Sequence, residues 1–106
     1  MADINLSAAQ ATAKDLESGF PGIEALPLNI DVAKEASISK AVADVVRQFG
    51  RIDYAVNNAG IGGSGVLSAE HKVEDWIRTI DVNMHGVWLS SRAEIREMLT
   101  QDRREE

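Results

Sequence analysis

The sequence contains no cysteine, and this absence excludes a disulfide framework and any metal site built on thiolates. Positive charge is also scarce: 11 lysines and arginines stand against 17 aspartates and glutamates, a net charge of -6. Nucleic acids and anionic membrane surfaces bind basic patches, so we expect neither as a partner. The two histidines, His71 and His85, are too few and too far apart for a metal site, and no metal is expected.

Long apolar runs are missing as well. No stretch approaches the roughly 20 residues needed to span a bilayer, and the first residues lack the basic and apolar segments of a signal peptide. At 106 residues, with 44% apolar and 26% charged residues, the composition is ordinary for one modest globular domain. These properties predict a soluble, cytoplasmic protein without a membrane partner.

Catalytic side chains are few. Tyr54 is the only tyrosine, and because it lies inside a predicted strand with no lysine four residues later, we expect it in the core. No lysine follows Lys72, and Ser90 and Ser91 have no histidine partner for nucleophilic chemistry. The sequence therefore indicates no reaction that this chain could run unaided.

Three helices are predicted, over residues 8–18, 38–49 and 73–98. Ser7 and Gln10 form a capping box at the start of the first, and Gly19 is expected to end it in the left-handed conformation. The second has apolar residues at helical spacing and ends at Gly50. The third carries a long apolar stripe that Gly86 interrupts, with Trp76 and Trp88 as expected apolar anchors. A charged tail over 101–106 is expected to fray.

Strands are predicted between these helices. Ala2–Ile4 is typical of the end of a strand, and apolar segments over Ala25–Val32 and Ile52–Asn57 predict two more. Alternating strands and helices predict an α/β fold with a parallel sheet and helical crossovers. In such sheets ligands bind at the carboxyl ends of the strands, where Asp3, Asp31 and residues 57–60 lie.

The most specific motif is Asn57-Asn58-Ala59-Gly60 after an apolar strand, followed by Asp81-Val82-Asn83 in the long helix. Together they resemble the middle of a short-chain dehydrogenase/reductase. The resemblance implies a partial Rossmann-like, doubly wound parallel sheet that holds the end of the second strand and the third and fourth strands. Neither a glycine-rich turn before the first strand nor a Tyr-x-x-x-Lys pair is present. We therefore expect residues 1–106 to be an incomplete NAD(P)-binding domain, a central fragment.

The resemblance also assigns cofactor-binding roles. It implies that Asp3 accepts hydrogen bonds from the adenine ribose hydroxyls, which favours NAD over NADP because a carboxylate repels a 2′-phosphate. Asp31 would meet the adenine amino group, and Val32 would cover the ring. The alternatives are that Asp3 is a surface aspartate and that Asp31 simply caps the following helix.

Three further roles come from the same resemblance. The turn Asn57-Asn58-Ala59-Gly60 would lie under the adenosine ribose as part of the cofactor site, where a side chain larger than methyl on Ala59 or Gly60 would collide with the cofactor. The asparagine amides, that of Asn57 included, would tie neighbouring strands together. Asn83 would belong to the catalytic set, holding a helix distortion and a water near the catalytic lysine. The alternatives are a plain turn at 57–60 and, for Asn83, a polar side chain satisfied by backbone groups.

The implied function is that of a fragment of an NAD(P)-dependent oxidoreductase that interconverts a small-molecule alcohol and carbonyl by hydride transfer. As an isolated chain it is expected to be inactive, because the catalytic Ser, Tyr and Lys are missing. Alternatives are a non-catalytic binding or regulatory module that associates with intact relatives, and an unrelated α/β domain such as a flavodoxin-like one. The family packs the helix equivalent to 73–98 against its copy, which predicts a homo-oligomer.

The family's strand order makes a further prediction about the sheet. That order places an additional strand between the segments 25–31 and 52–57. Because this chain lacks that strand, a gap of about 10 to 15 Å would separate the two segments. We expect either that the two segments slide together into a pair or that the gap stays open and the chain is marginally folded.

Overall fold

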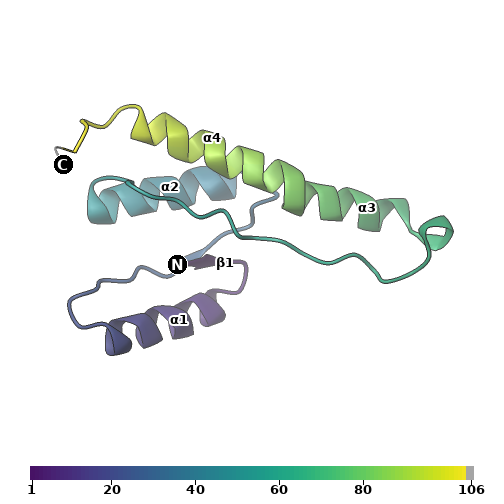
Figure 1. Cartoon of the computed structure of the whole chain (residues 1–106), viewed down its shortest axis with the longest axis horizontal. Coiled ribbons are helices and arrows are strands. Elements are labelled where there is room, and N and C mark those ends of the chain that lie inside the picture. Colours follow the sequence, from purple (N-terminus) through teal and green to yellow (C-terminus); the bar gives the residue numbers. More distant parts are fainter. Residues whose placement is uncertain (105–106) are drawn as a thin grey trace.

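The computed structural model describes residues 1–104, and in it the strands lie between α1 on one side and α2 and α4 on the other (Figure 1). This arrangement confirms the α/β class. The elements are β1 (Ala2–Asp3), α1 (Leu6–Gly19), β2 (Leu28–Asn29), α2 (Glu35–Phe49), the 3₁₀ turn η1 (Ser68–Glu70), α3 (Val73–Ile80), the π-helical segment η2 (Asp81–His85) and α4 (Gly86–Met98).

The sheet consists of β1 and β2, which pair in parallel with Ala2 opposite Leu28 and Asp3 opposite Asn29. Helix α1 makes the crossover that parallel pairing requires. The Asn29 side-chain amide donates to the Ile4 carbonyl at 2.7 Å and fixes the loop after β1. The strand predicted over 25–32 shortens to Leu28–Asn29, because β1 offers a partner along only two residues.

Helix α1 begins earlier than predicted. Asn5 is its N-cap, and the Asn5 side chain accepts from the Ala8 amide at 3.1 Å, so the capping box at Ser7 does not form. Gly19 lies in the last turn and is not left-handed, so that prediction was wrong. In α2 the prediction is confirmed, since Gly50 caps the helix with φ 83°.

The segment over residues 51–57 is extended but is not a strand, so the prediction of a strand over Ile52–Asn57 was wrong. Within residues 1–104, no backbone hydrogen bond joins it to β1 or β2. A strand needs a neighbour to pair with, and the described residues place none beside this segment. Tyr54 is 91% exposed and Val56 is 88% exposed, so Tyr54 does not lie in the core. Two outcomes were expected for the sheet, and the one in which this segment pairs with the strand that contains β2 does not occur.

Helices α3 and α4 form one continuous rod through η2, which confirms the long helix predicted over 73–98 (Figure 1). Its interruption lies over Asp81–His85, just before Gly86, where the Gly86 amide bonds to the Asp81 carbonyl five residues back. Trp76 and Trp88 are exposed on this rod and are not buried anchors.

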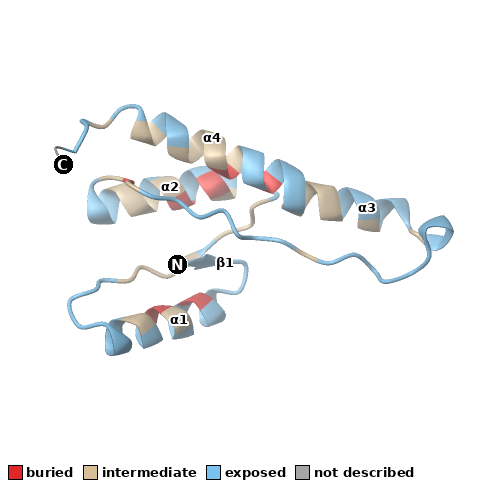
Figure 2. Ribbon diagram, viewed as in Figure 1, coloured by how far each residue is buried: buried red, intermediate tan, exposed pale blue. Residues whose placement is uncertain are grey.

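The buried residues are few, and Figure 2 shows most of them on α1, α2 and α4. They are Ala9, Ala13, Ile38, Ala41, Ile52, Gly86 and Ser90. Arg92 on α4 reaches Glu35 on α2 at 2.7 Å and stacks over Trp88, which joins the two helices at the surface. The radius of gyration is 16.3 Å, against about 13 Å for a compact chain of 100 residues. The shape is therefore extended around a thin core.

The start of the predicted frayed tail is anchored. The Gln101 side chain accepts from the Ile52 amide at 2.7 Å and donates to the Ile52 carbonyl at 2.8 Å, and Arg104 pairs with Asp53 at 3.0 Å. Residues 105–106 lie outside the described part of the chain. Among the described residues, no helix has the length and apolar character needed to cross a membrane.

Candidate functional site

Asp3 ends β1 and points its carboxylate into the turn that leads to α1. Its Oδ1 accepts from the Asn5 amide at 2.8 Å, and Asn5 in turn caps α1. The Ile30 amide donates to the Asp3 carbonyl at 3.0 Å, so the position of Asp3 is linked to the end of β2. The carboxylate of Asp3 is therefore held by its own turn, and its backbone carbonyl by the neighbouring strand segment.

Asp31 closes the turn between β2 and α2. Its Oδ1 accepts from the Ala33 amide at 3.0 Å, and its own amide donates to the Ser37 hydroxyl at 2.9 Å. The N-cap of α2 is Lys34, which makes no side-chain cap bond, so Asp31 does not cap this helix. The role of Ser37 was missed by sequence reasoning, although a serine in the first turn after a strand-end aspartate is a usable signal.

Val32 packs directly on the long helical rod. A Cβ built on Gly86 would lie 2.8 Å from Val32 Cγ2 and 3.1 Å from the Val32 carbonyl oxygen. Only glycine allows the segment after β2 to come this close to α4. From the sequence, Gly86 was noticed only as an interruption of the apolar stripe, and nothing in the pattern indicated which residue it would contact.

The Asn57 side chain binds α4 and not a neighbouring strand. Its Nδ2 donates to Glu94 Oε2 at 2.8 Å and to the Ser91 hydroxyl at 3.2 Å. The expectation that this amide ties strands together was therefore wrong, because no strand lies next to it in the described residues. The following residues, Ala59 and Gly60, are exposed.

Asn83 lies at the centre of η2 and holds the loop that follows Gly60. Its Oδ1 accepts from the Ile61 amide and its Nδ2 donates to the Ile61 carbonyl, each at 2.8 Å. A Cβ on Gly60 would come within 3.4 Å of Asn83 Oδ1. Asn83 is thus satisfied by backbone groups, but they belong to a loop 22 residues away and not to its own helix.

These contacts connect several of the predicted site residues to one another or to the rod. Asp3 is bonded to the end of β2, Val32 packs on Gly86, and Asn83, three residues before Gly86, holds the loop after Gly60. The segment after β2 and the loop after Gly60 therefore meet the rod at or next to η2, and the end of β1 is linked to this place through the end of β2. This is the edge at which open α/β sheets bind ligands.

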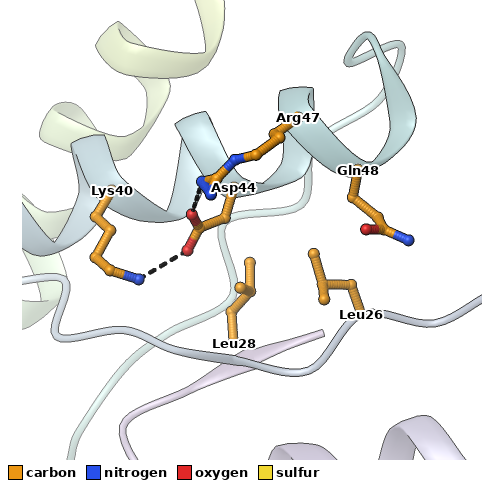
Figure 3. A pocket seen from close by; sticks show the side chains of 6 residues that line it. All are labelled: Leu26, Leu28, Lys40, Asp44, Arg47 and Gln48. Carbon is orange, nitrogen blue, oxygen red and sulfur yellow. Dashed lines mark hydrogen bonds and ion pairs between the residues drawn. The ribbon is translucent and has the colours of Figure 1, made fainter.

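Two hollows in the surface lie elsewhere. One, of about 350 Å³, lies between α2 and the segment that leads into β2; it is lined by Leu26, Leu28, Lys40, Asp44, Arg47 and Gln48 (Figure 3). The hydrogen bond from Lys40, together with the nearby charge of Arg47, lowers the pKa of Asp44. The other, of about 360 Å³, is lined by Gly63, Ser68, His71, Trp76 and Thr79. Neither includes a predicted site residue, and the described residues hold no cluster of potential metal ligands.

A sequence profile of the short chain dehydrogenase family matches residues 1–105. The chain belongs to the short-chain dehydrogenase family. The structure of NAD⁺-bound xylitol dehydrogenase superposes with a TM-score of 0.88 at 31% identity, covering 94% of this chain and 38% of that one. A 3-ketoacyl-(acyl-carrier-protein) reductase from Brucella melitensis, complexed with NADH, gives a TM-score of 0.81 at 32% identity over 91% of this chain and 38% of its own.

The sequence relatives extend well beyond the matched region. The short-chain dehydrogenase srdC of Neurospora crassa is 39% identical over 105 residues, which are 96% of this chain and 39% of the relative. The short chain dehydrogenase tazN of Aspergillus terreus is 39% identical over 88 residues, which are 82% of this chain and 19% of the relative. The chain thus spans at most about two fifths of the length of these short-chain dehydrogenases.

The Asn83 contact yields a testable prediction. In Asn83→Asp the side chain keeps an acceptor for the Ile61 amide but places a carboxylate against the Ile61 carbonyl. We expect proteolytic cleavage within residues 57–65 to accelerate about fivefold or more, the factor that follows from losing about 1 kcal/mol of local stability. Limited proteolysis with mass spectrometry measures this. Asn58→Asp makes the same chemical change in the exposed turn and is the control; equal cleavage of both variants would contradict the role given to Asn83.

Proposed function

We propose that the chain forms the adenosine side of an NAD site in an NAD(P)-dependent oxidoreductase that interconverts an alcohol and a carbonyl of a small molecule. One observation carries this proposal: Gly86 and Asn83, on one helical rod, bind the segments that follow β2 and residue 57. The family supports the reaction type, and the segment that follows β2, at the carboxyl end of that strand, supports this position for the cofactor.

The residues on this edge fit the adenosine half of NAD. Asp3 uses Oδ1 for the Asn5 amide, and no protein donor is assigned to its other carboxylate oxygen within residues 1–104. That oxygen is suited to accept from the ribose hydroxyls, and the negative charge disfavours a 2′-phosphate. NAD⁺ and NADH in the named structural relatives support NAD, with NADP as the weaker ligand.

The other residues proposed for this site also suit the adenosine half of NAD. Asp31 offers its carboxylate to the adenine amino group, and Val32 offers an apolar surface to the ring. Ala59 and Gly60 are small and exposed, so the backbone there leaves room for the ribose. Bound NAD supplies the hydride acceptor; Asn83 acts by holding the loop after Gly60 and the distorted helix in place.

The cofactor preference is testable by calorimetric titration of the whole chain. We expect NAD to bind weakly and more tightly than NADP, and Asp3→Asn to reduce the NAD preference by about tenfold, since hydrogen bonds to charged groups contribute about 1.5 kcal/mol or more. Asp15→Asn removes the same charge from the exposed face of α1 and is the control. An unchanged preference in Asp3→Asn, or tighter binding of NADP than of NAD by the wild type, would contradict the role assigned to Asp3.

We also expect no dehydrogenase turnover by the purified 106-residue chain with any alcohol or ketone. Proton transfer in this chemistry needs a tyrosine with a lysine four residues on, and Tyr54 is followed at that position by Asn58. The measurement is NADH formation or consumption with a sample free of host enzymes. Turnover that follows the chain through purification would contradict the expectation.

A second proposal concerns association. The rod formed by α3, η2 and α4 exposes apolar side chains along its length, including Trp76, Met84, Trp88 and Ile95. Exposed apolar stripes of this kind mark protein contacts. We propose that the rod pairs with a second copy of itself, giving a homo-oligomer; the alternative is a non-catalytic module that uses the same rod to bind intact relatives. A cytoplasmic location stays a prediction from the sequence.

The association proposal predicts that Trp76→Glu shifts the chain toward monomer. Trp76 is 62% exposed on the rod, and a carboxylate there would have to be buried in the contact. Light scattering across a concentration series measures the change in mass. Phe20→Glu replaces an aromatic of similar exposure, 58%, at the end of α1 and is the control. A wild-type chain that stays monomeric, or equal dissociation of both variants, would count against pairing through the rod.

A further inference from the structure

We infer that Gly86 is a positioning residue for the adenine side of the proposed NAD site, because its missing side chain sets where Val32 and its neighbours lie. This inference rests on the proposed function and adds to it a residue that touches no part of the cofactor. Gly86 is buried, and its contact is with the segment that follows β2, which is far from it in sequence.

The contact leaves no room for a side chain. A Cβ on Gly86 would meet Val32 Cγ2 at 2.8 Å, Val32 Cβ at 3.1 Å and the Val32 carbonyl oxygen at 3.1 Å. A valine has little freedom at χ1, and the carbonyl belongs to the backbone, so rotating the Val32 side chain does not relieve all three contacts. An alanine at position 86 therefore has to displace the backbone around Val32.

Displacing the backbone of Val32 also affects Asp31 and Asp3, through the hydrogen bonds of the same segment. The Asp31 amide is bonded to Ser37, and the Asp31 carboxylate is bonded to the Ala33 amide on the other side of Val32. Ile30, just before Asp31, is bonded to the Asp3 carbonyl. Moving Val32 thus moves the group that meets the adenine amino group and strains the link to Asp3.

The contacts of the helical rod oppose its movement away from Val32. Gly86 closes the π-helical segment through its amide bond to the Asp81 carbonyl, and Asn83 within that segment is bonded twice to Ile61. Retreat of the rod from Val32 would stretch the contacts of Asn83.

The backbone conformation of Gly86 does not itself require glycine. Gly86 has φ -61° and ψ -42°, ordinary right-handed helix, where alanine is the better helix former. The close contact with Val32, and not the helix, accounts for glycine here.

The test is NMR titration of the ¹⁵N-labelled 106-residue chain with AMP as the probe of the adenosine half. We expect Gly86→Ala to raise the dissociation constant for AMP about fivefold or more, the lower end of what overpacking a close contact costs. The amide signals of residues 30–33 should shift in the free variant. Gly19→Ala is the matched control, because a Cβ on that helical glycine meets nothing within 4 Å.

A double-mutant cycle separates positioning from general packing. Val32→Ala removes the 2.8 Å contact and also part of the cover over the ring, so it should weaken AMP binding by itself. Adding Gly86→Ala to Val32→Ala should then have a smaller effect than in the wild-type chain, because only the two 3.1 Å contacts, with the Cβ and the carbonyl oxygen of residue 32, remain. Because the double variant relieves the shortest contact, it also keeps the comparison available if Gly86→Ala alone folds poorly.

The outcomes are distinct. A Gly86→Ala chain that binds AMP as tightly as the wild type overturns this inference and leaves the proposed function intact. An equal loss from Gly86→Ala in the wild-type chain and in the Val32→Ala variant also overturns it, because the effect would not pass through the valine side chain. A wild-type chain that shows no AMP-dependent shift at residues 30–33 refutes the proposed function and this inference together.

Discussion

The paired hydrogen bonds between the Asn83 side chain and the Ile61 backbone are the interaction on which the rest of the arrangement depends. They fasten the long connection from the end of α2 to the start of α3 to the middle of the helical rod. The distortion of the helix over Asp81–His85 lies at the same place, directly before the contact of Gly86 with Val32. Without this fastening, no sheet bond among the described residues would keep the loop after Gly60 near the segment that follows β2.

Side-chain amides take over a task that sheet pairing usually performs. Gln101 binds both backbone groups of Ile52, Asn57 binds Glu94, and Asn83 binds both backbone groups of Ile61. The amides of Gln101 and Asn83 each present one donor and one acceptor to the backbone, as a neighbouring strand would, whereas Asn57 donates to side chains of α4. Between these points the backbone of residues 54–56 faces solvent, which is tolerable because water satisfies it. The connection is therefore held along the rod at three places and left open between them.

Sequence patterns predicted those parts of the fold that local residues decide. The α/β class, the rod over 73–98 and the end of α2 at Gly50 followed from periodicity and cap chemistry. The capping box at Ser7 failed because Asn5, two residues earlier, supplies a better placed cap. The strand over 52–57 failed because strand formation depends on a neighbour, which an apolar run cannot supply for itself. For the same reason Tyr54, expected in the core, is exposed. The cofactor-binding positions taken from the motifs stay predictions, and the contact of Gly86 with Val32 could not be predicted, since it joins residues far apart in the chain.

Residue-specific amide hydrogen exchange on the whole chain tests most directly whether side-chain amides hold the connection between α2 and α3. If side chains on and after the rod hold the connection, the amides of Ile52 and Ile61 should exchange slowly, because they donate to Gln101 and Asn83. The amides of Tyr54, Ala55 and Val56 should exchange rapidly, as expected for exposed backbone without a partner. Uniform slow exchange from Ile52 to Asn57 would show that this segment is a paired strand, and it would contradict the account.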